Sequence, residues 1–359
     1  MCIICEKKFI KDVISIDCYY CDKVTKIPSF YKNITRLACY NSGITKLPII
    51  CTNLIHLGCH NCISISFIPR YNNLEYLNCS RTSITIIPIL PNLKKLYCNL
   101  CTNLTKISSC VNIIFIECTE CTNLTEIFNV HDHNINYKLE ELLCTGCIAL
   151  TNLPKLSNLV ELYCANSGIK KIGHAFYKLK KLHCGNCINL ESISNTLYNL
   201  LDLYCSRCIK LTELPNIPSI IYINFSHCEN INKLPNLPNL KSLICEYCPN
   251  ITEIPDIFSN LDFISCIGCV NLIKTPLRYI ETRYFDSPWI KLRNKFQDNE
   301  QYDNNIKKLK VLQHWFRKNF KYLVFKRWIK SEEGVKWIYD PDRIGGKVSK
   351  LLIMRSINK

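Results

Sequence analysis

The chain has 359 residues, of which 48% are hydrophobic, and its 45 Lys and Arg against 29 Asp and Glu give a net charge of +16. That length allows a large core, and no apolar run approaches the ~20 residues that a membrane-spanning helix needs. The first residues show neither an apolar segment of signal-peptide length nor a small-residue cleavage site. We therefore expect a protein that is not secreted and stays in a reducing cytoplasm, where its 26 cysteines are free thiols.

Residues 1–12 precede the first copy of a repeat that continues to residue 276. The end of a stack of repeats exposes a core edge, so this segment is predicted to be an N-terminal cap. Cys2 and Cys5 form a C-x-x-C pair there. A buried cap is favoured over a metal or redox pair because the intervening Ile3 and Ile4 are apolar.

The stretch LKSLICEYCPNITEIP, residues 240–255, shows the repeat, with apolar residues at positions 1, 4, 6, 12 and 15. Eleven of the twelve spacings between copies are 19 to 21 residues, and the exception of 26 residues holds a polar insertion near residues 128–138, expected to be a surface loop. Position 1 is occupied by Val13, Ile34, Leu54, Leu74, Leu93, Ile113, Leu139, Leu159, Leu179, Leu200, Ile220, Leu240 and Leu261. This fixed period predicts a solenoid of thirteen repeats over residues 13–276.

Each repeat is predicted to contain one short strand and an extended return segment. Positions 4 and 6 show the alternation of a strand: Leu243 and Cys245 point one way, and Ser242, Ile244 and Glu246 point the other. Proline follows the last apolar position in many repeats, for example Pro154, Pro215 and Pro255. Proline there excludes a helix and favours extended, polyproline-like backbone.

These residues resemble the leucine-rich repeat, L-x-x-L-x-L-x-x-N/C-x-L, with cysteine at its sixth and ninth positions. The short period and the L-P-x-L-P-x-x-L spacing of residues 234–243 look most like the short repeats of bacterial effectors. Cysteine usage, the Asn-, Ile- and Lys-rich composition and the tail resemble leucine-rich repeat proteins of mimivirus-like giant viruses. The resemblance implies an α/β-type solenoid: a curved parallel β-sheet with a mostly extended convex side and a C-terminal helical cap or tail.

Cysteine occupies position 6 in twelve repeats and position 9 in ten, which gives nine repeats a C-x-x-C pair. The structural interpretation is favoured over zinc or redox chemistry. Phe225 replaces a position-6 cysteine, which a core site tolerates and a metal site does not, and Ser42, Thr82 and Ser167 fill position 9, where a small polar group bonds the turn backbone. The segment His56–Cys62 remains the best metal candidate, but its histidines should face away from its cysteines. We predict no cofactor and no metal.

The outward residues between positions 4 and 6 form a column on the concave face that includes Tyr97, Tyr163, His183 and Tyr204. Tyr40 and His60, at position 7, belong to a second aromatic row. Tyrosine offers a large rigid surface with a polar tip and is enriched at binding sites, although strands favour tyrosine in any case. These six residues are the candidate binding site.

The tail has 20 Lys and Arg against 9 Asp and Glu from residue 277 onward and no cysteine. Residues 277–305 are predicted to be a linker or cap and residues 306–359 a basic helical segment, with an amphipathic helix over 306–328. Capping of the last repeat is its simplest role. Binding of RNA, DNA or anionic lipid is an alternative, and the resemblance to a calmodulin-binding IQ motif is weak.

The leading functional hypothesis is a non-enzymatic scaffold that binds an unknown protein partner on the concave face. The alternative is nucleic-acid or anionic-surface binding through the basic tail, and a zinc protein is a third reading. No nucleophile elbow, paired-carboxylate motif or phosphate loop supports an enzyme, and no cysteine follows Cys269 to form a thioester in the tail.

Overall fold

The computed structural model describes residue 4 and residues 13–129, 135–258 and 260–275. The chain divides into two units, one formed by Met1–Cys248 with Ile257–Ser265 and the other by Pro249–Asp256 with Cys266–Lys359. All strands named below belong to the first unit. The predicted cap at 1–12, apart from residue 4, and the segments 277–305 and 306–359 lie outside the described residues.

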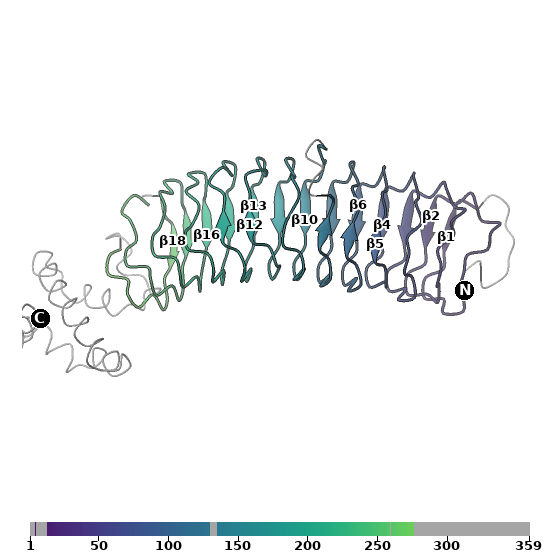
Figure 1. The fold of residues 1–359 in the computed structure, drawn as a ribbon, viewed down its shortest axis with the longest axis horizontal. Coiled ribbons are helices and arrows are strands. Elements are labelled where there is room, and N and C mark those ends of the chain that lie inside the picture. Colours follow the sequence, from purple (N-terminus) through teal and green to yellow (C-terminus); the bar gives the residue numbers. More distant parts are fainter. Residues whose placement is uncertain (1–3, 5–12, 130–134, 259, 276–359) are drawn as a thin grey trace, which may run out of the picture. The chain divides into compact units, whose positions relative to one another are not determined.

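The first unit is built on one sheet of thirteen parallel strands (Figure 1). Each strand occupies positions 3 to 5 of one sequence repeat, and equivalent positions pair, as in Leu162 with Leu182. In sheet order the strands are β1 (Ser15–Asp17), β2 (Arg36–Ala38), β3 (His56–Gly58), β4 (Tyr76–Asn78), β6 (Lys95–Tyr97), β8 (Phe115–Glu117), β10 (Glu141–Leu143), β11 (Glu161–Tyr163), β13 (Lys181–His183), β15 (Asp202–Tyr204), β16 (Tyr222–Asn224), β17 (Ser242–Ile244) and β18 (Phe263–Ser265). The fold is therefore a parallel β-solenoid, as the repeat predicted.

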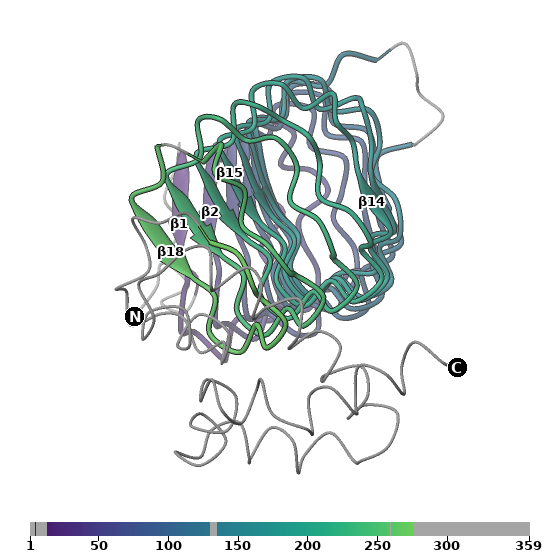
Figure 2. The same ribbon diagram turned by 90° about the vertical axis from the view of Figure 1, so that its left-hand side faces the viewer.

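The return segments carry two short parallel sheets, which lie across the core from the main sheet (Figure 2). One contains β5 (Ile86–Ile87), β7 (Lys106–Ile107) and β9 (Glu126–Ile127), and the other β12 (Lys171–Ile172) and β14 (Ser192–Ile193). No helix occurs in the described residues. The prediction of a return side without helices is thus confirmed for this part of the chain.

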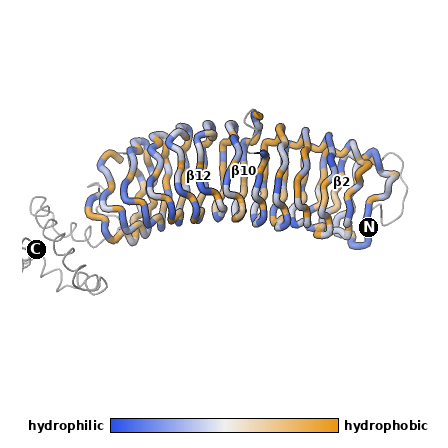
Figure 3. The backbone as a smooth tube through the Cα atoms, in the orientation of Figure 1, coloured by the Kyte–Doolittle hydropathy of each residue, from blue (hydrophilic) through white to orange (hydrophobic). Residues whose placement is uncertain are grey.

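The core consists of columns of equivalent apolar side chains, one from each repeat. Leu159, Leu162, Cys164 and Ile169, at positions 1, 4, 6 and 11 of one repeat, are all 0% exposed. Hydrophobic and hydrophilic residues alternate along the backbone throughout the stack (Figure 3). Burying one Leu or Ile contributes about 1.5–3 kcal/mol. Each repeat therefore stabilises its neighbours through the apolar side chains that it adds to the columns.

A left-handed backbone conformation recurs at position 8, where the chain turns after the strand. It occurs in all thirteen repeats, with φ between 52° and 75°. Glycine and asparagine accept this conformation at little cost, and they occupy Asn41, Asn61, Gly146, Asn166, Asn186 and Gly268. The other seven repeats place Tyr, Arg, Leu, Glu or His there, so repeat stacking rather than local preference fixes this turn.

An asparagine ladder supports the opposite corner of the repeat, immediately before position 1. There the side-chain amide donates a hydrogen bond to a backbone carbonyl of the preceding repeat, as in Asn199 to Tyr177 (2.7 Å) and Asn239 to Pro218 (3.0 Å). The other members are Asn73, Asn92, Asn112, Asn158 and Asn260. These carbonyls would otherwise lack a protein donor at a turn, so the amides join consecutive repeats.

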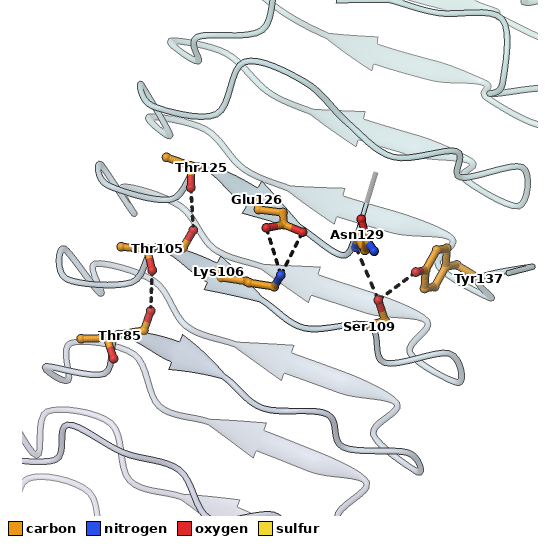
Figure 4. Close-up of polar contacts among 8 residues, drawn as sticks. All are labelled: Thr85, Thr105, Lys106, Ser109, Thr125, Glu126, Asn129 and Tyr137. Atoms are coloured by element: carbon orange, nitrogen blue, oxygen red, sulfur yellow. Dashed lines mark hydrogen bonds and ion pairs between the residues drawn. The ribbon is translucent and has the colours of Figure 1, made fainter. Parts of the chain in front are cut away.

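The insertion near 128–138 is anchored at both ends, while residues 130–134 lie outside the described part of the chain. The Phe128 ring stacks on the Tyr137 ring with centroids 4.3 Å apart, and both side chains are buried. The Tyr137 hydroxyl donates to Ser109 Oγ at 3.0 Å, and at the other end of β7 and β9 the Thr105 and Thr125 hydroxyls each bond the preceding repeat (Figure 4). The insertion therefore does not interrupt the pairing of the repeats on either side of it.

In the second unit, the described residues show the same stacking. Glu253 and Lys274 form a parallel bridge, and the Ile254 N–H donates to the Lys274 carbonyl at 2.8 Å. Lys274 Nζ also pairs with an Asp256 carboxylate oxygen at 3.2 Å.

Candidate binding face of the sheet

The cysteines form two ladders with different roles. Position-6 thiols such as Cys59 and Cys144 are fully buried, and burial raises their pKa well above the ordinary value. Position-9 thiols instead donate to the position-6 carbonyl of the preceding repeat. This contact is 2.9 Å for Cys62 and Cys121, 3.0 Å for Cys187, 3.1 Å for Cys101, Cys147, Cys208 and Cys228, and 3.3 Å for Cys248.

The hydroxyls at position 9 bond differently, because they reach the position-6 carbonyl of their own repeat, which also accepts a hydrogen bond from the thiol of the next repeat. Ser42 Oγ donates to the Cys39 carbonyl at 2.5 Å and Thr82 Oγ1 to the Cys79 carbonyl at 2.6 Å. Ser167 Oγ lies 3.4 Å from the thiol of Cys187 in the next repeat. The cysteines thus hold repeats together by hydrogen bonds, in agreement with the structural interpretation of the C-x-x-C pairs.

The residues of the best metal candidate point in different directions. The His56 ring stacks on Tyr76 with centroids 4.2 Å apart, and the His60 ring stacks on Tyr40 at 4.4 Å, whereas Cys59 and Cys62 are buried. Within the described part of the chain, no group of three or more His, Cys, Asp or Glu side chains is placed to hold a metal ion.

The outward side chains of the main sheet, at positions 3 and 5, form what we call the strand face. Two groups of touching rings lie on it. The first, the N-terminal ring group, links His56, Tyr76, Tyr97 and Phe115 at centroid distances of 4.2, 5.5 and 5.1 Å. The second, the central ring group, links Tyr163, His183, Tyr204 and Tyr222 at 4.7, 4.0 and 4.4 Å. Each group extends over four neighbouring strands.

The structure brings together only some of the six candidate residues. Tyr163, His183 and Tyr204 form one continuous contact, but Tyr97 belongs to the other ring group, because strands β8 and β10 lie between β6 and β11. Tyr40 and His60 form a third set with Tyr19, beyond the strand ends, whose ring planes lie within 8° of parallel.

Four ring residues were missed by the sequence analysis: His56, Tyr76, Phe115 and Tyr222. All four occupy position 3, which faces outward with position 5 because alternate residues of a strand share a face. The alternation already placed Ser242 on that side of the strand, so the signal was present. Reading the position-3 column as well as the position-5 column would have found them.

Between the ring groups, the strand face carries three carboxylates, Glu117, Glu141 and Glu161. Glu161 accepts hydrogen bonds from Lys181 Nζ (2.9 Å) and from the Tyr163 hydroxyl (2.7 Å), and these bonds hold its pKa below the ordinary value. Partial burial and the neighbouring Glu161 raise the pKa of Glu141, with Glu117 adding to the effect. The surroundings of Glu141 therefore disfavour its negative charge in the free protein.

Burial disfavours the charged form of three ring histidines, of which His56 and His183 lie on the strand face and His60 lies beyond the strand ends. Burial lowers the pKa of His56, His60 and His183, and the Arg36 charge adds to the effect at His56. The Nδ1 atoms of His56 and His60 are buried without a hydrogen-bond partner among the described residues. These rings consequently contribute to the face as flat stacking groups.

The structure contains no helix, within its described residues, that has the length and hydropathy of a membrane span. No protein-family model matches the chain, and no curated protein matches it.

Three of the solved structures similar to the chain are bacterial proteins. A leucine-rich repeat protein of Leptospira interrogans is 18% identical, with a TM-score of 0.47, over 74% of this chain and 84% of that one. YopM of Yersinia pestis, a leucine-rich effector, is 21% identical, with a TM-score of 0.44, over 74% and 71%. InlJ of Listeria monocytogenes, whose functional domain includes a cysteine ladder, is 20% identical, with a TM-score of 0.39, over 72% and 66%.

These similarities identify no ligand or partner. Repeats of about 20 residues, a single strand at positions 3 to 5 and a parallel register throughout make this a solenoid of the leucine-rich repeat type.

Proposed function

We propose that the protein is a non-enzymatic scaffold that binds a protein partner on the strand face. The central ring group supports this most directly, because four rings from neighbouring strands contact one another on the surface. Aromatic side chains dominate the energetics of protein interfaces since they bury large area at little entropic cost. Because each ring is carried by a strand that is paired on both sides, the surface is rigid before binding. Little further conformational entropy is then lost when a partner binds.

Affinity capture from the producing cell tests the proposal. Full-length protein should enrich a specific protein, and the Tyr163→Ala/Tyr204→Ala variant should lose it. Tyr177→Ala/Tyr198→Ala is the matched control, since these tyrosines are 49% and 68% exposed but lie on the return segments. Circular dichroism must show that both variants fold. Equal recovery by the two variants would remove the strand face from the proposal.

We further propose that the protein functions in a reducing compartment. Position-9 thiols such as Cys121 and Cys147 are buried hydrogen-bond donors, a role that oxidation would abolish. Mass spectrometry of protein alkylated directly in cell lysate should find these cysteines reduced. A disulfide between ladder cysteines would contradict the proposal. The resemblance to giant-virus proteins and a place in host cytoplasm or virion remain predictions, which localisation in the producing cell can test.

A further inference from the structure

We propose that the partner docks a basic segment on the strand face, with its Arg or Lys side chains over Glu117 and Glu141, between the two ring groups. This inference rests on the proposed function and adds the chemistry of the partner: a cationic protein segment rather than a nucleic acid.

Strand register brings the carboxylates together. Glu141 pairs directly with Phe115 on one side and with Glu161 on the other, while Glu117, on the same strand as Phe115, pairs with Leu143. Paired residues of neighbouring strands lie about 4.8 Å apart. The three carboxylates therefore occupy three consecutive strands of one face.

The charges of this patch are incompletely neutralised within the protein. Glu161 has Lys181 as its ion-pair partner at 2.9 Å, whereas Glu117 and Glu141 have none among the described residues. On the side of Glu141 away from Glu161, the nearest lysine at position 3 is Lys95, and Phe115 lies between Lys95 and Glu141. Like charges this close repel, so an incoming cation relieves an unfavourable interaction that already exists in the free protein.

Aromatic rings border the same carboxylates. Tyr97 and Phe115 touch at 5.1 Å on one side, and Tyr163, bonded to Glu161, stands on the other. A guanidinium group can pair with a carboxylate through its planar edge while its face stacks on an aromatic ring. Carboxylates bordered by rings suit Arg side chains in particular. They disfavour a phosphate backbone, because it would meet Glu117 and Glu141 directly.

Fluorescence anisotropy with the full-length protein tests the inference. The probe is a short arginine-rich peptide, and the control is the same peptide with glutamine in place of every arginine. We expect the arginine peptide to bind and the glutamine peptide not to bind. The Glu117→Gln/Glu141→Gln variant should bind at least ~10-fold more weakly, a factor that corresponds to ~1.4 kcal/mol.

Asp22→Asn/Glu213→Gln is the control, since it changes charge equally at two exposed residues away from the strand face. It should bind like the unaltered protein. The melting temperature of Glu117→Gln/Glu141→Gln should be equal or higher, because the substitutions remove repulsion. This separates lost binding from lost folding.

Three results would overturn the inference: equal peptide binding by the two double variants, preference for an RNA oligonucleotide over the peptide, or carbodiimide cross-links in the free protein joining Glu141 to a lysine of residues 277–359. The last would make the chain's own tail the occupant. If Tyr163→Ala/Tyr204→Ala loses the captured partner while Glu117→Gln/Glu141→Gln keeps it, the proposed function stands and only the cationic chemistry fails.

Discussion

Replacement of Cys121 tests whether the position-9 thiols hold the repeats together by hydrogen bonding or merely fill space. Its Sγ donates to the Cys98 carbonyl at 2.9 Å, and both residues are 0% exposed. Cys121→Ala leaves that carbonyl without this donor, at a cost of about 1–3 kcal/mol for a buried polar group. Cys121→Ser keeps a hydrogen-bond donor at the position that Ser42 and Thr82 occupy in other repeats.

We therefore expect Cys121→Ala to lower the free energy of unfolding by about 2 kcal/mol and Cys121→Ser by less than half of that. An unfolding entropy of about 2.1 cal/mol/K per residue makes 1 kcal/mol equivalent to about 1–2 °C in a chain of this length, so the alanine variant should melt about 2–4 °C lower. Thermal and urea unfolding followed by circular dichroism, under reducing conditions, give both quantities.

The matched position-6 pair is Cys144→Ala and Cys144→Ser. Cys144 is fully buried in the apolar column, so a serine hydroxyl there should be no better tolerated than alanine. Equal stability of the alanine and serine variants at position 121 would refute the hydrogen-bond ladder and leave only packing. A serine advantage at both positions would refute the difference between the two ladders.

Two further predictions concern backbone approach and pH. Gly168→Ala should lower the free energy of unfolding by about 1–3 kcal/mol, because a Cβ there would lie 2.3 Å from the Ile148 carbonyl oxygen. The control is Gly173→Ala, which should be tolerated because its Cβ would have nothing within 4 Å. Equal melting temperatures of the two variants would contradict this reasoning. Because burial lowers the pKa of His60, the unfolded chain binds a proton below about pH 6.5 that the folded chain resists, so this residue should make stability fall as the pH drops from 7 toward 5. His60→Tyr keeps a ring stacked on Tyr40 and removes the titration, and its melting temperature should therefore fall less over the same range; an unchanged pH dependence would show that His60 does not contribute.

The repeat period and its apolar positions determined the fold of the described chain. Position 1 could be numbered in every copy, and each strand then occupies positions 3 to 5, because only one side of a short strand can face a continuous core. Proline on the return segment likewise predicted extended backbone there. Phe225 and Ser42 revealed the structural role of the cysteines, since each replaces a cysteine with a residue that suits a core or a turn but not a metal.

The ring groups and the acidic patch were decided by tertiary structure. Tyr163 and Tyr222 are 59 residues apart in sequence and meet through His183 and Tyr204 only because strand pairing places them on neighbouring strands. Glu117 and Glu141 come close although the insertion separates their repeats, since its anchored ends leave the register unchanged.

Backbone conformation was also beyond the sequence. Nothing about Leu100 or Arg207 indicates a left-handed turn, and both adopt it because every neighbouring repeat does. Local composition determines which side of the chain is buried. Which side chains meet on the surface, and which turns carry unfavourable residues, depends on the stacking of the whole array.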